Sequence, residues 1–493
     1  MNFLLLINDA PRYKYFFAEI AKKIEEEGHK VFYAINSVKT KKTEPLPWID
    51  ESKQAFFFDE YMSKEQNFTI NYLNDETWGD ILYPEFDRFF NHHYNLDQSN
   101  EYWETIIKGL DSFFSNLILN KEIDCILYEN VSNSFAYSAY KVSKKLNRYY
   151  IGLMGSRLPN RYEIQTSIIE DELKCIDHML LSPVTLEETN WYKEYSNSLI
   201  NIQPDYMKQS SINKQKKISD FFSIKKIKKL FVYLNLIFSL DSTYDYQKGS
   251  IKKLIIAAIK QDLRKRKNEK KSSKYYLDSK KVDELLEKNE RFYIYPPHYH
   301  PESSTSVLAM DYTLELNNII NIHNNLPVGT YLYVKDHISA RGVQSEDFYK
   351  KISALPGVRL INFSYNVKKL IPKSLGVITI NSTVGYEALI LGKPVYLFGK
   401  VFYMNFPNVI KINSFLDLRR KLNKKENKQD KENIEKYIIA YKRYTYEGKL
   451  YINNPELWSD EYFRKLVENI FHRLSLVDGL SLVEIGGDKC IEN

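Results

Sequence analysis

Apolar runs and helical periods alternate along the first part of the chain. A continuous apolar run at residues 3–7 predicts a buried strand, and residues 15–27 have the apolar period of a helix that ends at Gly28. A second apolar run, residues 30–35, predicts another strand. The alternation continues with predicted helices over 102–120 and 134–146, and with strands over 125–128 and 149–153. This order predicts a parallel sheet with helices on both faces.

The pattern restarts near residue 291. Strands are predicted over 291–295, 331–335 and 358–361, and helices over 313–324, 345–354 and 367–371. Residues 377–398 are predicted to form a further strand, a turn of small residues, a helix closed by Gly392 and Pro394, and a second strand. We therefore predict an α/β protein with two Rossmann-like domains facing a cleft, over 1–165 and 291–412. Residues 166–290 are predicted to be a helical connection, and residues 413–493 C-terminal helices and a tail.

Composition indicates a soluble globular protein. A chain of 493 residues that is 43% hydrophobic and 27% charged can form two or three domains with full cores. Its three cysteines, Cys125, Cys175 and Cys490, are odd in number and widely spaced, which favours a reducing compartment and argues against a disulfide framework or a zinc site. The apolar start lacks the basic residues of a signal peptide, and no apolar run reaches the roughly 20 residues that span a membrane.

The positive charge is concentrated in one segment. The chain has a net charge of +7, but residues 206–281 alone hold 21 Lys and Arg against 6 Asp and Glu. One interpretation is a set of solvated helices between the domains; the other is a surface for an anionic partner. Residues 221–231 place aromatic and aliphatic side chains among lysines, as interfacial helices do. This favours an anionic membrane surface over nucleic acid.

The turn at residues 381–385 is the first candidate ligand site. Ser382, Thr383 and Gly385 place hydroxyls and free N–H groups at the positive end of the helix that follows, which suits a phosphate group. With Thr383 as N-cap, a capping box would need an acidic residue where Tyr386 stands. Glu387 is therefore predicted to accept hydrogen bonds from a ribose or sugar diol, with complementation of the helix dipole as the alternative.

Two further loops follow predicted strands of the same half. His298, His300 and Glu302 come after strand 291–295, where polar groups bind ligands in open α/β sheets. A nearby third ligand of suitable spacing is missing, so we predict contact with a phosphate or carboxylate in preference to a metal.

Lys335 and His337 follow strand 331–335. A cation there would neutralise the leaving group of a glycosyl transfer that uses no metal, although a loop salt bridge is the plainer interpretation.

The first half offers its own candidates. Glu129, at the end of a strand, could act as general base on an acceptor hydroxyl or as nucleophile, or could hold a backbone turn. Arg157 and Arg161 follow another strand and suit anionic sugars or phosphates, with structural ion pairs as an equal alternative. The chain lacks a Walker loop, a G-x-G-x-x-G motif, a nucleophile elbow and a D-x-D motif at a strand end.

Taken together, these loops resemble the bacterial capsule polysaccharide biosynthesis family, which includes Kdo transferases. The resemblance rests on residues 298–302 with Thr305, residues 333–337, and residues 382–388 with 392–394. It extends over about 290–405 and is weaker in the first half, at Glu129-Asn130 and Ser156-Arg157. Family members commonly have His-Pro where this chain has His337-Ile338, and some have Asp-Gly where Asn130-Val131 stand.

The resemblance implies a GT-B fold and a glycosyltransferase of capsular or lipopolysaccharide assembly. The donor would be a nucleotide-activated sugar, such as CMP-Kdo or another CMP-linked sugar, held mainly by the second half. The acceptor would be a glycan or glycolipid, held by the first half. The enzyme would need no cofactor or metal and would work in the cytoplasm, at the inner membrane face. The alternatives are a sugar-nucleotide epimerase and a membrane-associated polysaccharide-binding protein without activity.

Overall fold

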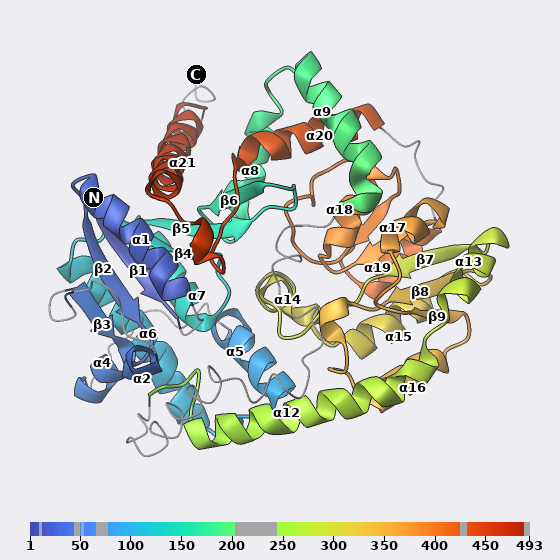
Figure 1. Ribbon diagram of the computed structural model, residues 1–493, viewed down its shortest axis with the longest axis horizontal. Coiled ribbons are helices and arrows are strands. Elements are labelled where there is room, and N and C mark those ends of the chain that lie inside the picture. The colour runs from blue at the N-terminus through green and yellow to red at the C-terminus, as the bar shows by residue number, and fades with distance from the viewer. Residues whose placement is uncertain are drawn as a thin grey trace.

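The computed structural model describes residues 1–8, 12–43, 50, 54–65, 77–202, 244–423 and 431–487. It is an α/β structure of the GT-B kind, in which two halves each carry one largely parallel sheet between helices (Figure 1). The predicted fold class is therefore confirmed.

The first half is built on a sheet with strand order β3-β2-β1-β4-β5-β6-β13. Strands β1 to β5 run parallel, whereas β6 is antiparallel to β5, and β13 is antiparallel to β6. The strands are β1 (Asn2–Ile7), β2 (Lys30–Ile35), β3 (Ala55–Phe57), β4 (Cys125–Glu129), β5 (Tyr149–Gly155), β6 (Arg161–Gln165) and β13 (Tyr446–Glu447). The helices are α1 (Tyr13–Glu26), α2 (Val38–Thr43), α4 (Phe58–Lys64), α5 (Trp78–His92), α6 (Asn100–Asn120) and α7 (Ser134–Lys145).

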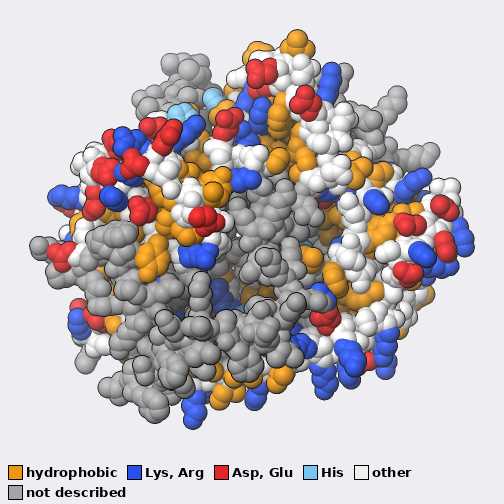
Figure 2. All heavy atoms as spheres, in the orientation of Figure 1, with side chains coloured by type: hydrophobic (Ala, Val, Ile, Leu, Met, Phe, Trp, Pro, Cys, Tyr) orange, Lys and Arg blue, Asp and Glu red, His pale blue; other side chains and the backbone are white. Residues whose placement is uncertain are grey.

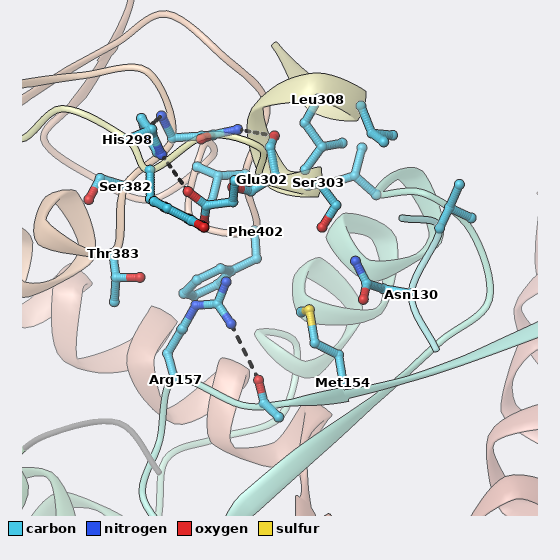
Figure 3. Close-up of a pocket in the computed structure, with 18 of the residues that line it drawn as sticks. Asn130, Met154, Arg157, His298, Glu302, Ser303, Leu308, Ser382, Thr383 and Phe402 are labelled. Carbon is cyan, nitrogen blue, oxygen red and sulfur yellow. Dashed lines mark hydrogen bonds and ion pairs between the residues drawn. The ribbon is translucent and has the colours of Figure 1, made fainter. Parts of the chain in front are cut away.

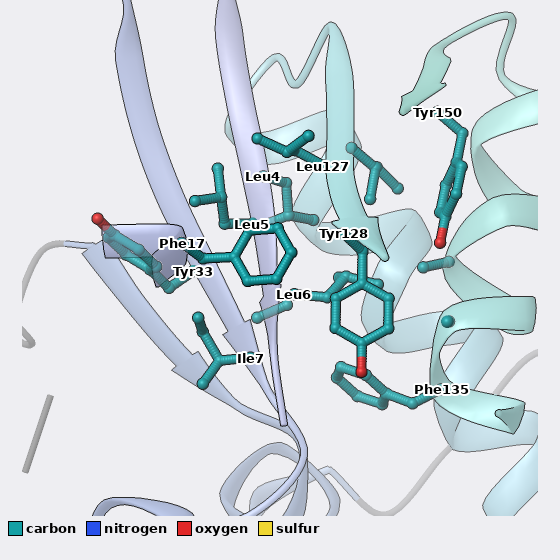
Figure 4. Packing of buried hydrophobic residues seen from close by; sticks show 14 of the residues in the cluster. Leu4, Leu5, Leu6, Ile7, Phe17, Tyr33, Leu127, Tyr128, Phe135 and Tyr150 are labelled. Carbon is teal, nitrogen blue, oxygen red and sulfur yellow. The ribbon is translucent and has the colours of Figure 1, made fainter. Parts of the chain in front are cut away.

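The central strands of this sheet are apolar on both faces because helices cover both. Leu4, Leu5 and Leu6 on β1 are wholly buried, as is Leu127 on β4 (Figure 4). Phe17 of α1 packs on one side, where its ring stacks on that of Tyr128. Burial on both faces explains why these strands appear in the sequence as unbroken apolar runs.

The second half repeats the arrangement with an all-parallel sheet of order β9-β8-β7-β10-β11-β12. Its strands are β7 (Phe292–Tyr295), β8 (Tyr331–Lys335), β9 (Val358–Ile361), β10 (Gly376–Thr379), β11 (Val395–Leu397) and β12 (Val409–Lys411). Its helices are α14 (Ser303–Leu308), α15 (Glu315–Asn325), α16 (Glu346–Ser353), α17 (Val367–Leu370), α18 (Thr383–Ile390) and α19 (Phe415–Leu422). The strand order reverses direction between β7 and β10, which makes these two strands the topological switch point.

Several helices join the halves. The connection contains α8 (Glu170–Met179), α9 (Leu186–Ser198), α12 (Ile251–Ser272) and α13 (Ser279–Glu287). Helix α12 runs from α5 of the first half to α16 of the second (Figure 1).

The last part of the chain returns to the first half. Helix α20 (Lys431–Tyr444) packs on α8 and α9, and Arg443 forms an ion pair with Glu188 (2.6 Å). Strand β13 then joins the first sheet, and α21 (Asp460–Gly487) packs on α1. The C-terminal residues therefore complete the first half and hold the connection helices against it.

The elements agree closely with the predicted pattern, with one correction at a helix start. The N-cap of α18 is Ser382, whose side chain accepts a hydrogen bond from Val384 N, and not Thr383. Glu387 consequently lies beyond the first turn of this helix. The aromatic and basic stretch 221–231 lies outside the described residues. Within the described part of the chain, no helix is long and apolar enough to cross a membrane.

Candidate active site

A pocket of about 400 Å³ lies between the two halves. From the second half it is lined by the segments that follow β7, β8 and β10, and from the first half by those that follow β4 and β5 together with the start of α8. His298 and Ser382 lie on one side, and Asn130, Met154 and Arg157 on the other (Figure 3). The pocket is thus at the carboxyl ends of the switch-point strands, where open α/β sheets bind ligands, and its size suits a small-molecule ligand.

The N-terminus of α18 forms part of the pocket wall. Asn381, Ser382 and Thr383 all line it. Gly385 does not, but its missing side chain is needed, because a Cβ there would collide with the Tyr403 hydroxyl, which donates a hydrogen bond to the carbonyl of Ser382 (2.6 Å). Tyr403 thereby holds the turn that presents Ser382 and Thr383. The first turn of a helix carries partial positive charge, so this wall attracts an anion.

His298 and Glu302 form a polar pair on the same wall. His298 Nδ1 lies 3.4 Å from Glu302 Oε2, and His298 Nε2 accepts a hydrogen bond from Asn381 N (3.4 Å). This network assigns the proton of a neutral His298 to Nδ1. Burial acts to raise the pKa of Glu302, but the hydrogen bond from His298 and the electrostatic interactions with His298 and His337 outweigh it and lower that pKa to about 2. Glu302 is therefore an anion that anchors His298.

His337 completes this part of the pocket. Its Nδ1 accepts a hydrogen bond from Ser339 N (3.1 Å) at the start of a short 3-10 turn, Ile338–Ala340. Burial lowers the pKa of His337, an effect that the nearby Glu302 opposes. The neutral ring therefore carries its proton on Nε2, where it can donate to a ligand.

His300 lies outside the pocket lining and is part of an ion-pair network. Its ring is buried, with Nδ1 3.2 Å from Asp87 Oδ2 and Nε2 3.6 Å from Glu315 Oε1. Glu315 also accepts hydrogen bonds from Tyr295 Oη (2.6 Å) and His298 N (2.8 Å). His300 thus connects the loop after β7 to α5 of the first half, and the structure gives it a supporting position behind His298.

Lys335 and Glu387 also lie behind the lining. Lys335 Nζ donates to the carbonyls of Asp336 (2.8 Å) and Phe363 (3.0 Å), and burial lowers its pKa to about 8. The Glu387 carboxylate lies 3.1 Å from Lys368 Nζ, and both side chains are buried. Neither Lys335 nor Glu387 is among the residues that line the pocket. Their predicted roles, leaving-group stabilisation and sugar or ribose binding, therefore stay predictions.

Of the candidate residues in the first half, one lines the pocket and two do not. Arg157 lines the pocket, held by hydrogen bonds from its N–H to Tyr441 Oη (3.1 Å) and from its guanidinium to Gly155 O (3.3 Å). The Glu129 carboxylate is outside the lining and accepts a hydrogen bond from Ser132 (2.9 Å). Arg161 binds Thr445 and Glu447 next to β13, the structural ion pair that was its alternative interpretation.

The sequence interpretation missed two acidic residues, Glu163 of the first half and Glu172 of the connection. Glu172 of α8 lines the pocket together with Gln165, and Glu163 lies beside both. In sequence, Glu163 and Gln165 alternate with apolar residues along a strand, which normally indicates a solvent face. No cluster of His, Cys, Asp and Glu suited to a metal occurs among the described residues.

These features define a two-domain α/β protein with a polar ligand pocket at its switch point. The sequence profile of the capsule polysaccharide biosynthesis protein family matches residues 196–444, and the chain belongs to this family. The match includes the second half and all three of the loops that carried the resemblance. No curated protein matches the chain in sequence.

Solved structures of similar fold have low sequence identity. KpsC from Thermosulfurimonas dismutans, in its beta Kdo 2,7 transferase structure, is 12% identical, with a TM-score of 0.34 over 70% of this chain and 88% of that one. Its beta Kdo 2,4 transferase structure is also 12% identical, with a TM-score of 0.34 over 65% of this chain and 80% of that one. A third structure is UDP-GlcNAc 2-epimerase from Methanocaldococcus jannaschii in complex with UDP-GlcNAc and UDP. It is 11% identical, with a TM-score of 0.25 over 90% of this chain and 100% of that one. At these values the likeness says nothing about activity.

Proposed function

We propose that this chain is a glycosyltransferase of bacterial surface-polysaccharide biosynthesis that binds a nucleotide-activated sugar in the pocket between its halves. The observation that carries the proposal is the wall at the N-terminus of α18, where Ser382 and Thr383 face a pocket that Arg157 borders from the other half. Membership of the capsule polysaccharide biosynthesis family supports the reaction class.

In this proposal the α18 wall holds the phosphate of the donor. When the bond between the sugar and the phosphate breaks, negative charge accumulates on the phosphate oxygen. The helix N-terminus and the hydroxyls of Ser382 and Thr383 stabilise that charge, and His337 donates a hydrogen bond to it from Nε2. Donors that are already in place when the charge develops lower the barrier without reorganisation.

A CMP-linked sugar acid such as CMP-Kdo is the donor that we propose to test first. Such a donor carries one phosphate and one sugar carboxylate, and the pocket offers the anion-attracting N-terminus of α18 on one side and a guanidinium, Arg157, on the other. A planar guanidinium matches a carboxylate in two parallel hydrogen bonds. The first half would then face the glycan or glycolipid acceptor.

Helix α12 supports the proposal that the enzyme works at an anionic membrane surface. Ile256, Ile259 and Leu263 point to solvent with exposures of 45%, 59% and 64%, and they share one helix face because they lie three and four residues apart. Exposed basic residues flank this face: Lys252, Lys253, Lys260, Arg266, Lys267, Lys270 and Lys271. Figure 2 shows basic and hydrophobic side chains together along the lower edge, where α12 lies in Figure 1. An apolar stripe between cations fits a bilayer with acidic headgroups.

A thermal-shift panel of CMP, UDP, GDP and ADP against the purified protein tests the nucleotide site. A ligand that binds only the native state raises the apparent melting temperature according to its occupancy. Stabilisation by CMP alone supports a CMP-sugar donor, whereas a response to UDP, GDP or ADP keeps the transferase and changes the donor. Silence from all four overturns the proposal and favours a polysaccharide-binding protein. Conversion of a nucleotide sugar to its epimer without acceptor would identify an epimerase.

A further inference from the structure

Two buried carboxyl groups, one from the first half and one from the connection, meet at the edge of the pocket. Glu163 on β6 is 1% exposed and Glu172 on α8 is 4% exposed. Gln165 bridges them, with Nε2 at 3.5 Å from Glu163 Oε2 and at 3.4 Å from Glu172 Oε2. Glu172 and Gln165 line the pocket, whereas Glu163 lies behind them. The pair therefore has one member in contact with the pocket and one in the interior.

The surroundings of the two carboxyls differ. The Tyr441 hydroxyl donates a hydrogen bond to Glu163 Oε1, and the positive charges of Arg157 and Arg473 favour the ionised form of Glu163. Glu172 Oε1 is buried and receives no hydrogen bond from any residue that the structure describes. A buried carboxyl oxygen without a donor has a substantial free-energy cost, which a ligand hydroxyl would remove.

The surroundings of the pair favour retention of a proton. Burial and the neighbouring Glu163 raise the pKa of Glu172 well above its usual range, and burial also raises the pKa of Glu163. Two buried carboxyl groups that both lie within 3.5 Å of one amide nitrogen disfavour double ionisation, which favours one proton held between them. Tyr444 and Cys175 are the other titratable groups near the pair.

We propose that Glu172, paired with Glu163, accepts the proton of the attacking acceptor hydroxyl in the glycosyl transfer. This inference rests on the proposed function. The proposed base lies on the wall opposite the α18 phosphate site. Its carboxyl group borders the pocket, and one of its oxygens receives no hydrogen bond from the described residues. The other carboxylate of the lining, Glu302, is already bound to His298 on the phosphate side.

The step balances within the pair. The acceptor oxygen forms a bond to the anomeric carbon as the bond from that carbon to the phosphate oxygen breaks, and the nucleotide leaves with the electron pair. The hydroxyl proton passes to Glu172 while the shared proton moves fully to Glu163. The pair thus goes from one proton to two, and it returns the second proton to water after product release.

The experiment compares Glu172→Gln and Glu163→Gln with wild type and with Glu170→Gln as matched control. Glu170 lies on the same helix, but its side chain is 55% exposed. Nucleotide release is measured from CMP-Kdo, UDP-N-acetylglucosamine, GDP-mannose and ADP-glucose, with water in the place of the acceptor hydroxyl, and binding by the thermal shift with the corresponding nucleotides. A glutamine at position 172 retains the shape of the protonated carboxyl and can donate to Glu163. We therefore expect an unchanged or higher melting temperature and an unchanged nucleotide shift.

Release by the Glu172→Gln and Glu163→Gln variants is expected to fall by about 100-fold or more, the usual contribution of a general base, with no change for Glu170→Gln. Release within about threefold of wild type, or loss of the nucleotide shift in Glu172→Gln, would overturn the inference. If Glu172→Gln does not fold, the inference is tested by Glu163→Gln and by the pH profile of wild-type nucleotide release. Release must fall towards acid pH, because a second proton on the pair leaves no base. A wild type that neither binds nor releases any nucleotide instead refutes the proposed function itself.

Discussion

His300 of the second half and Asp87 of the first form a buried ion pair across the two halves, with 3.2 Å between Nδ1 and Oδ2. Burial alone would lower the pKa of His300. Hydrogen bonds and charge interactions with Asp87 and Glu315 outweigh burial and raise that pKa to about 10. The loop that carries His298 into the pocket is therefore tied to α5 by a cationic histidine.

Replacing His300 by Gln should destabilise the protein in a pH-dependent way. The folded state holds a proton on His300 that the unfolded chain loses above its ordinary pKa of about 6.5. The stabilisation is therefore complete below that pH and is lost as the pH rises towards 10. We expect the variant to lose about 3 kcal/mol of unfolding free energy at pH 6 and much less at pH 9.5, as measured by urea denaturation. An equal loss at both pH values would show that the ring is not charged.

Replacing Glu387 by Ala should lower stability, because Lys368 would be left buried without its carboxylate. The two groups lie 3.1 Å apart, and Lys368 Nζ also donates to Leu199 O (2.9 Å) in the connection between the halves. Loss of one partner of a buried pair costs about 3 kcal/mol. The melting temperature tests this expectation. Nucleotide affinity, measured well below the melting temperature, tests the sequence-based prediction separately, and a weaker affinity would show that Glu387 also reaches the ligand.

Replacing Thr383 by Val should weaken nucleotide binding without altering the fold. The substitution removes only the hydroxyl at the first residue of α18, while the N-cap, Ser382, remains. A hydrogen bond to a charged phosphate contributes about 1.5 to 3 kcal/mol, so affinity for the nucleotide that gives a thermal shift should fall about tenfold or more. Calorimetric titration measures the change. A variant with wild-type affinity would remove this hydroxyl from the phosphate site.

Replacing Ile259 and Leu263 by Asp should weaken binding to anionic vesicles. Both side chains project from α12 and make no part of the core. Sedimentation with phosphatidylcholine vesicles that contain about 30% phosphatidylserine should show a loss of at least about tenfold, and wild-type binding should decrease with added salt. Leu186→Asp is the matched control, because Leu186 is 76% exposed on α9. Equal binding by wild type and the double variant would exclude this face.

Much of the fold was predictable because its signals are local. Each parallel strand is covered on both faces, so its apolar run is visible without knowledge of its neighbours, as in residues 3–7 and 377–379. The loops after β7, β8 and β10 were predictable as ligand loops for a similar reason. Strand ends with polar residues meet at one edge of a parallel sheet, and three of the predicted loops do line one pocket, through His298, His337 and Ser382.

The contacts of individual side chains could not be predicted in the same way. Lys335, His300 and Glu387 lie in the predicted loops or helix, yet their charged groups face carbonyls, Asp87 or Lys368 behind the pocket wall. These partners come from distant parts of the chain. A residue's type and its position after a strand indicate the edge of the sheet, but not the direction of its side chain.

The sequence by itself determined the two parallel sheets, the turn at Ser382 and the family resemblance, since each depends on residues close together in the chain. Only the tertiary structure decided which polar groups share a site. Glu163 and Glu172 are buried because α20, from near the end of the chain, brings Tyr441 over β6 and α8. Burial and the proximity of two carboxyls are properties of packing between distant segments, and they are what raises the pKa values of this pair.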